Sequence, residues 1–213
     1  MAITNYTELQ AAVANWLARD DLSGRIPEFI TLCEAKLNRE LYARQMETRS
    51  TTTVDIASDE PEFITLPDDF QSMRRMRLSS VSGKPHLLYK SGGQMDEYRT
   101  SIGDIAGRPL YFSIIADELE LVPTPDDAYI IEMVYRTNIP ALADNTTNWL
   151  LTLAPDVYLY GALLEAAPYT KEDERIQTWL TGFASAIDGL NRLSLASTFN
   201  AGPMTMQVSG STP

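Results

Sequence analysis

The chain has 213 residues, 44% of them hydrophobic, so it can bury a core as one large domain or two small ones. Its 17 Lys and Arg against 29 Asp and Glu give a net charge of -12, which excludes a charge-driven grip on nucleic acid but not DNA passing nearby. With one cysteine and one histidine, an internal disulfide is excluded and a zinc or copper site is not expected.

Two helices are predicted over residues 7–44. Thr7 and Gln10 fit a capping box, and Trp16 lies on the apolar stripe that follows, so we expect it in the core. A break after Asp20 separates the second helix, which begins at Ile26. Its apolar stripe is Ile26, Phe29, Ile30, Cys33, Leu37 and Leu41. Cys33 is therefore interpreted as a buried core residue rather than a reactive thiol. The first ten residues lack the features of a signal peptide, so we expect the protein to start in a cytoplasm.

From residue 45 the pattern changes to short extended segments. Extended chain is predicted over residues 51–56, and strands are predicted near 63–66, 72–81, 85–89, 109–115, 118–123 and 129–137, with a tight turn at Asp117. A short helix is predicted between Gln94 and Arg99. Many short strands separated by turns are typical of a small β-sandwich or an open barrel.

The stretch NWLLTLAPDVYLYGALLEAAPY, residues 148–169, predicts a helix that is apolar on every side. Pro155 suits its first turn, and we expect Pro168 to end it. It is too short, and interrupted by Glu165, for a membrane span, so a protein core or a subunit interface must cover it. A further amphipathic helix is predicted over residues 171–190, with Trp179 in the core.

These elements predict an α+β fold. Residues 1–44 and 148–192 are expected to form one antiparallel helical bundle from both chain ends. Residues 45–147 are then an inserted antiparallel β-sandwich or open barrel, and residues 193–213 an extended C-terminal tail. The predicted helices beside residues 155–168 supply its cover within one chain.

The tail after Arg192 has no charged residue and is rich in Ser, Thr and Gly. It is either a frayed terminus or a segment that docks on a partner. Docking would use its apolar residues, which are Leu193, Leu195, Phe199, Met204, Met206 and Val208.

No constellation in the chain predicts catalysis. His86 is the only histidine, and no nucleophile-elbow pattern surrounds any serine. The paired acids, such as Asp68 with Asp69 and Asp126 with Asp127, lie at predicted turns, where turn formation explains them. We therefore expect no enzyme, no cofactor and no metal.

The charge is unevenly distributed along the chain. Residues 71–99 contain six bases and two acids, whereas the residues from 100 onward contain five bases and fourteen acids. Such segregation suits head-to-tail association of identical subunits into a ring, unless the strand exteriors simply happen to be basic.

Five stretches resemble the head-to-tail adaptor proteins of tailed bacteriophages, especially those of short-tailed phages. They are TNYTELQAAVANWLARDDL, RIPEFITLCEAKLNREL, LPDDF, GRPLYF and NWLLTLAPDVYLYGALLEAAPY. The resemblance extends over about residues 3–190, and the last stretch is the most distinctive. Cys33 stands where the family pattern favours a small residue such as alanine. The tail beyond Arg192 is not part of the resemblance.

The resemblance implies a structural subunit of a ring, commonly twelvefold, that joins the portal protein to the tail or nozzle proteins. DNA would pass through the ring without specific binding. The tail would dock on the portal, and the protein would lie in the virion neck after assembly in the host cytoplasm. The alternative is a receptor- or glycan-binding β module of a phage tail, suggested by three Trp and ten Tyr.

Overall fold

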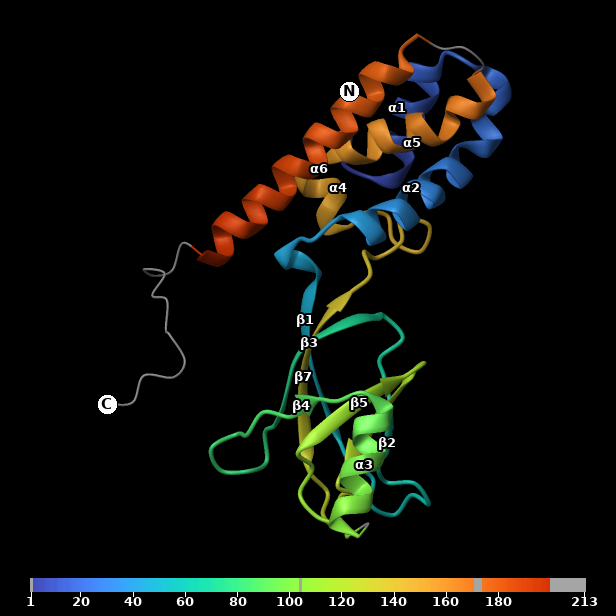
Figure 1. Ribbon diagram of the computed structural model, residues 1–213. Coiled ribbons are helices and arrows are strands. Elements are labelled where there is room, and N and C mark those ends of the chain that lie inside the picture. Colours follow the sequence, from blue (N-terminus) through green and yellow to red (C-terminus); the bar gives the residue numbers. More distant parts are fainter. Residues whose placement is uncertain (1, 104, 171–173, 200–213) are drawn as a thin grey trace. The chain divides into compact units, whose positions relative to one another are not determined.

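The computed structural model describes residues 2–103, 105–170 and 174–199 (Figure 1). These residues form two compact units, a helical unit of residues 2–45 and 139 onward and a β unit of residues 46–138. The predicted α+β class is confirmed, and no closed barrel forms in the described part of the chain. Residues 139–147, which the sequence analysis placed in the insertion, group with the helical unit.

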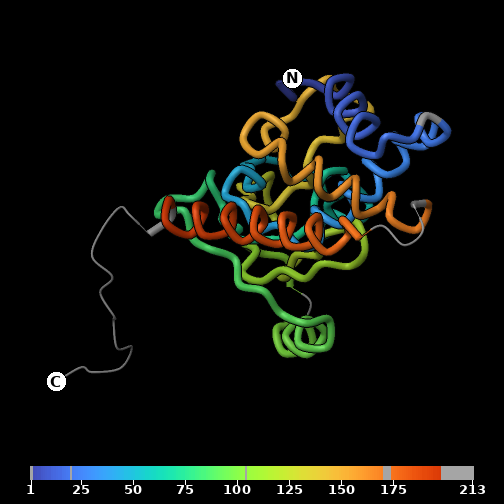
Figure 2. Tube along the Cα trace, turned by 90° about the horizontal axis from the view of Figure 1, so that it is seen from above, coloured from blue at the N-terminus to red at the C-terminus, as the bar shows by residue number. Residues whose placement is uncertain are grey.

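The helical unit is arranged around α5, as Figures 1 and 2 show in two views. Helix α5 contacts α1, α2, α4 and α6, so most of its large apolar residues are covered within the unit, although Tyr169 is 41% exposed. The buried residues include Val157, Tyr158, Ala162, Leu163 and Ala166. The helices of the unit are α1 (Tyr6–Leu17), α2 (Ile26–Glu40), α4 (Trp149–Leu153), α5 (Pro155–Thr170) and α6 (Ile176–Phe199), with a 3-10 turn over Asp20–Arg25.

The ends of these helices correct three predictions. The N-cap of α1 is Asn5, whose side chain accepts a hydrogen bond from the Glu8 backbone N–H at 2.9 Å, so Thr7 does not start the helix. Pro168 lies inside α5 and does not end it, because the helix continues to Thr170. Trp16 lies at the margin of the apolar stripe and is 42% exposed, although it packs edge-on against Tyr160.

Cys33 is fully buried, as predicted, and burial raises the pKa of its thiol, with the charge of Glu165 acting in the same direction. Trp179 is also buried, as predicted. The small residue opposite Cys33 is Gly161 of α5, where a side chain would have no room.

A buried polar network ties residues 139–148 to the helices. The Glu34 carboxylate of α2 accepts hydrogen bonds from the Leu142 backbone N–H at 2.9 Å and from the Tyr158 hydroxyl at 3.4 Å. The Asn148 side chain caps α4 by accepting from the Leu151 N–H, and its amide donates to the Tyr158 hydroxyl and to the Pro140 carbonyl. The buried side chains of Glu34, Asn148 and Tyr158 thus each have a hydrogen-bond partner.

The β unit contains two sheets that share one hydrophobic core. The first has the strand order β1-β7-β3 and the second β2-β6-β5-β4. Their bounds are β1 (Glu47–Thr53), β2 (Phe63–Thr65), β3 (Phe70–Leu78), β4 (Leu88–Tyr89), β5 (Tyr111–Ile115), β6 (Glu118–Val122) and β7 (Ile130–Thr137), with a 3-10 turn over Arg44–Met46 before β1.

The insertion is not antiparallel throughout, because β4 and β5 pair in parallel. A parallel pair needs a crossover, and α3 (Gly92–Ile102) supplies it. The predicted short helix is thus confirmed and extended. Ser91 caps α3 in a reciprocal capping box with Gln94.

Helix α6 corrects the prediction for the start of the tail. Residues 193–199 are helical rather than extended, because α6 continues through Arg192 to Phe199. Leu and Ala favour a helix here without any charge. Two α6 side chains also bind the chain after α2, since Asn191 Oδ1 accepts the Tyr42 N–H and Ser194 Oγ accepts the Arg44 N–H at 2.9–3.0 Å. Residues 200–213 lie outside the described part.

Candidate interaction surfaces

The described residues contain no group of three or more His, Cys, Asp or Glu placed to hold a metal ion. Within the same residues, no helix is both long and apolar enough to span a bilayer. The imidazole of His86 is exposed, and its backbone forms an isolated antiparallel bridge with Arg77. The features of interest are therefore surfaces rather than a reaction centre.

The end of α6 exposes large aliphatic side chains. Leu193 is 54% exposed and Leu195 is 59% exposed. Leu193 also lines a groove of about 550 Å³ together with Leu153 and Tyr160. Exposed leucines, one of which lines a groove, leave apolar area for a partner to bury.

Only part of the predicted docking set falls in this region. The structure places Leu193 and Leu195 near the C-terminal end of α6. Phe199 ends the helix, and its side chain is not described. Met204, Met206 and Val208 lie outside the described residues. The portal-docking role of the six residues stays a prediction.

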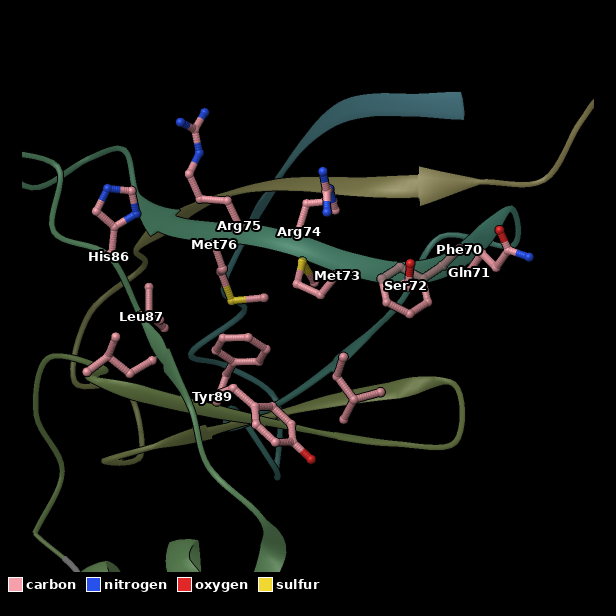
Figure 3. Close-up of a pocket in the computed structure, with 13 residues that line it drawn as sticks. Phe70, Gln71, Ser72, Met73, Arg74, Arg75, Met76, His86, Leu87 and Tyr89 are labelled. Atoms are coloured by element: carbon pink, nitrogen blue, oxygen red, sulfur yellow. The ribbon is translucent and has the colours of Figure 1, made fainter. Parts of the chain in front are cut away.

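An arginine surface covers the outer face of the sheet β1-β7-β3. It consists of Arg49, Arg74, Arg75 and Arg77. Figure 3 shows Arg74 and Arg75 on the side of β3 opposite Met73 and Met76. The strand register explains why these arginines share one face of the sheet. Arg49 and Arg75 both pair with Val134 of β7, and Arg77 pairs with Glu132 two residues away on the same face.

Glu132 organises this surface. Its side chain is 1% exposed and lies 2.8 Å from Arg77, 2.9 Å from Arg49 and 3.7 Å from Arg75. Hydrogen bonds from Arg77 and Arg49 lower the pKa of Glu132 to about 2. Arg74 pairs with Glu47 at 3.0 Å, so four arginines face two carboxylates and the surface is net positive.

An acidic loop follows β1 in the same unit. Residues 55–62 carry Asp55, Asp59, Glu60 and Glu62, of which the first three are exposed. The Val54 N–H, just before this loop, donates to the carbonyl of Tyr129, and two further acids, Asp126 and Asp127, come shortly before Tyr129 in the sequence. The β unit thus has an acidic loop as well as the basic face that the sequence indicated.

A cleft of about 680 Å³ opens between β3 and β4 (Figure 3). Met73 and Met76 of β3, Leu87 before β4, and Phe112 of β5 line it. The cleft is not predictable from sequence patterns, because its lining comes from separate segments of the chain. The signal that could have pointed to it is the apolar side of β3, since Met73 and Met76 interrupt a run of arginines.

The tryptophans that suggested a glycan-binding β module do not lie in the β unit. All three tryptophans, Trp16, Trp149 and Trp179, belong to the helical unit. Of the ten tyrosines, five lie in the β unit: Tyr89, Tyr98, Tyr111, Tyr129 and Tyr135.

The chain matches the family model described as SU10 adaptor protein over residues 4–207, which include residues of both units. No curated protein matches the chain.

Proposed function

Because the chain belongs to the SU10 adaptor protein family and is thus a phage adaptor protein, we propose that it forms a homo-oligomeric ring in the virion neck. The ring joins the portal protein to the tail or nozzle of a short-tailed phage. It is a structural subunit without catalysis, dodecameric in the assembled particle and built from chains made in the host cytoplasm. The observation that carries the proposal is the match over residues 4–207.

The charge of the chain supports passage of DNA through such a ring. A net charge of -12 repels the phosphate backbone and avoids the release of counterions that makes DNA binding tight. DNA can then slide through the channel without being held.

Portal docking is assigned to the end of α6, where Leu193 and Leu195 are exposed. Its test is a pair of variants on one helix. Leu195→Asp is expected to abolish copurification with the portal protein. Leu180→Asp, on the same helix and also exposed, is the matched control and is expected to retain it. Equal portal binding by both variants would remove this assignment.

Contacts between neighbouring copies are assigned to the arginine surface and the acidic loop. Surfaces of opposite sign at different places on one subunit suit a heterologous contact that closes into a ring. Arg74→Glu with Arg75→Glu is expected to disperse the ring, and Asp59→Lys with Glu60→Lys on the loop is expected to restore it in the same chain. Lys84→Glu, outside the surface, serves as the control.

Electron microscopy of the chain mixed with its portal protein tests the whole proposal. A ring beneath the portal is the expected result. A portal that stays bare at saturating concentrations of the chain contradicts the proposal.

A further inference from the structure

The acidic loop of residues 55–62 displays one large apolar side chain. Ile56 is 51% exposed, and both of its neighbours are exposed as well. Two hydrogen bonds hold the turn, because the Asp55 carboxylate accepts the Ala57 N–H at 3.0 Å and the Asp55 carbonyl accepts the Ser58 N–H at 3.3 Å. A turn held by its own hydrogen bonds presents Ile56 to a partner with little further loss of conformational entropy.

The cleft between β3 and β4 offers an apolar surface to such a side chain. Leu88 and Tyr89 of β4 line it and are exposed, so they leave apolar area for a partner to bury. Phe112 of the buried core also lines it. Figure 3 shows Met73 and Met76 pointing into the cleft from β3. The volume of about 680 Å³ exceeds that of one side chain, so the cleft can hold the tip of a loop.

The charges at the cleft match those of the loop. Arg74 and Arg75 also line the cleft, and their side chains are exposed. Ile56 follows Asp55 directly, and Asp59 comes three residues later. An apolar side chain between acids suits an apolar cleft beside arginines, whereas the positive charge of the arginines opposes entry of a basic segment. The acidic loop of a second copy has the required chemistry.

The loop and the cleft lie on opposite edges of both sheets of the β unit. The loop joins β1 to β2, whereas the cleft opens between β3 and β4. In the strand orders β1-β7-β3 and β2-β6-β5-β4, the loop therefore follows one edge and the cleft the other. None of residues 55–62, all of which are described, lines the cleft of its own chain. Complementary surfaces on opposite edges of one unit favour head-to-tail contacts, which can close into a ring.

We propose that Ile56 of one copy inserts into the cleft between β3 and β4 of the neighbouring copy. This contact rests on the proposed ring and deepens it, since it names the apolar anchor between copies and the site that receives it. Burial of Ile56 against Leu88 and Tyr89 supplies the affinity, and the acids beside it select the orientation by facing Arg74 and Arg75. Each copy gives one loop and receives another, so every cleft of a closed ring is filled.

Cysteine cross-linking of the full chain tests the contact directly. Ile56→Cys with Tyr89→Cys in one chain, assembled on portal and oxidised, is expected to give covalent multimers up to the size of the ring. Cys33 is buried and takes no part in the reaction. The control combines Ile56→Cys with Ile105→Cys, at an exposed position of the β unit outside the cleft, and is expected to give no multimers. Assembled rings that cross-link no better than this control would overturn the proposal.

Two single substitutions separate the apolar anchor from the charges. Ile56→Ser keeps every charge and is expected to raise at least about tenfold the chain concentration at which half of the portal carries a ring. Ala57→Ser, at the next exposed position, is expected to leave that concentration unchanged. In about 0.5 M salt the effect of Ile56→Ser should persist, whereas that of Arg74→Glu with Arg75→Glu should shrink, because salt screens exposed charges. Equal effects of Ile56→Ser and Ala57→Ser would also overturn the proposal.

Failure here is separable from failure of the proposed function. A ring beneath the portal without cross-links at Tyr89→Cys keeps the proposed function and overturns this contact. Covalent multimers of the chain alone, next to a portal that stays bare, support the contact and contradict the role at the portal. A bare portal without multimers contradicts both. Shielding of Tyr89→Cys from a maleimide only after tail protein is added would assign the cleft to that protein instead and overturn the contact between copies.

Discussion

Gly161 of α5 packs directly against Cys33 of α2, and a Cβ built on Gly161 would overlap the Cys33 Sγ. The same Cβ would lie 2.9 Å from the Phe183 ring of α6. The three helices can approach this closely only because position 161 has no side chain. This contact sets how near α5 lies to its neighbours.

Substitution Gly161→Ala is therefore expected to lower the free energy of unfolding by about 1–3 kcal/mol through overpacking. Urea unfolding measures the change. Cys33→Ala in the same chain is expected to recover part of the loss, because it removes the sulfur but leaves Phe183 in place. Gly189→Ala on α6, where a Cβ meets nothing within 4 Å, is the control and should stabilise by up to about 1 kcal/mol.

Glu34 gives the helical unit a pH dependence. Burial raises the pKa of its carboxyl, although the hydrogen bond from the Leu142 N–H opposes the shift. Between the ordinary and the raised pKa the folded chain holds a proton that the unfolded chain has lost, so the free energy of unfolding falls as pH rises through that window. Glu34→Gln is expected to remove this fall, as measured by urea unfolding across the window.

A second variant tests the hydrogen bonds of Glu34 rather than its charge. Glu34→Ala leaves the buried Leu142 N–H without an acceptor, which costs about 1–3 kcal/mol at every pH. Equal stability of Glu34→Gln and Glu34→Ala would contradict the role assigned to the network.

Glu132 has the opposite pH dependence. Its pKa of about 2 lies below the ordinary carboxyl value, so its contribution to stability is present above pH about 4.5 and is lost as pH falls toward 2. Glu132→Gln is expected to unfold at a lower temperature than the native chain at pH 7, with the difference disappearing near pH 2. Thermal unfolding followed by circular dichroism provides the measurement. A difference that persists at pH 2 would show that lost packing, not lost charge, is the cause.

Ser194 is expected to hold the chain segment that follows α2. Because Ser194 Oγ accepts the Arg44 N–H, Ser194→Ala should speed hydrogen exchange of that amide severalfold. Ser197→Ala removes a hydroxyl of the same helix that donates only to the Ser194 carbonyl, so it should leave the Arg44 amide unchanged. Unchanged exchange in Ser194→Ala would contradict this role.

Elements of the fold that are determined by neighbouring residues in the sequence were predictable. The strands around Asp117 follow from alternation and a turn, and the structure confirms them as β5 and β6. The burial of Cys33 follows from its place on one stripe of α2. The short helix predicted between Gln94 and Arg99 is confirmed as part of α3.

The predictions that the structure corrects concern features that depend on contacts between residues far apart in the sequence. Trp16 lies at the margin of its stripe, and only the positions of the neighbouring helices determine that it stays exposed. The parallel pairing of β4 with β5 depends on the crossover through α3, not on either strand sequence. The helical form of residues 193–199 is reinforced by Ser194 binding a backbone group some 150 positions earlier in the chain. The cleft beside β3 also depends on such contacts, because residues of β3 and β5, which are far apart in the sequence, line it.

Because α6 continues past Arg192, a force applied at the end of this helix acts on the rest of the helical unit. Leu190 is buried against the helical unit, and the nine residues from there to Phe199 extend the helix by about 14 Å. A flexible tether would let a partner move independently of the subunit. A continuous helix instead transmits torque. Rotation of a partner that binds Leu193 and Leu195 would therefore be passed to the helices packed around α5.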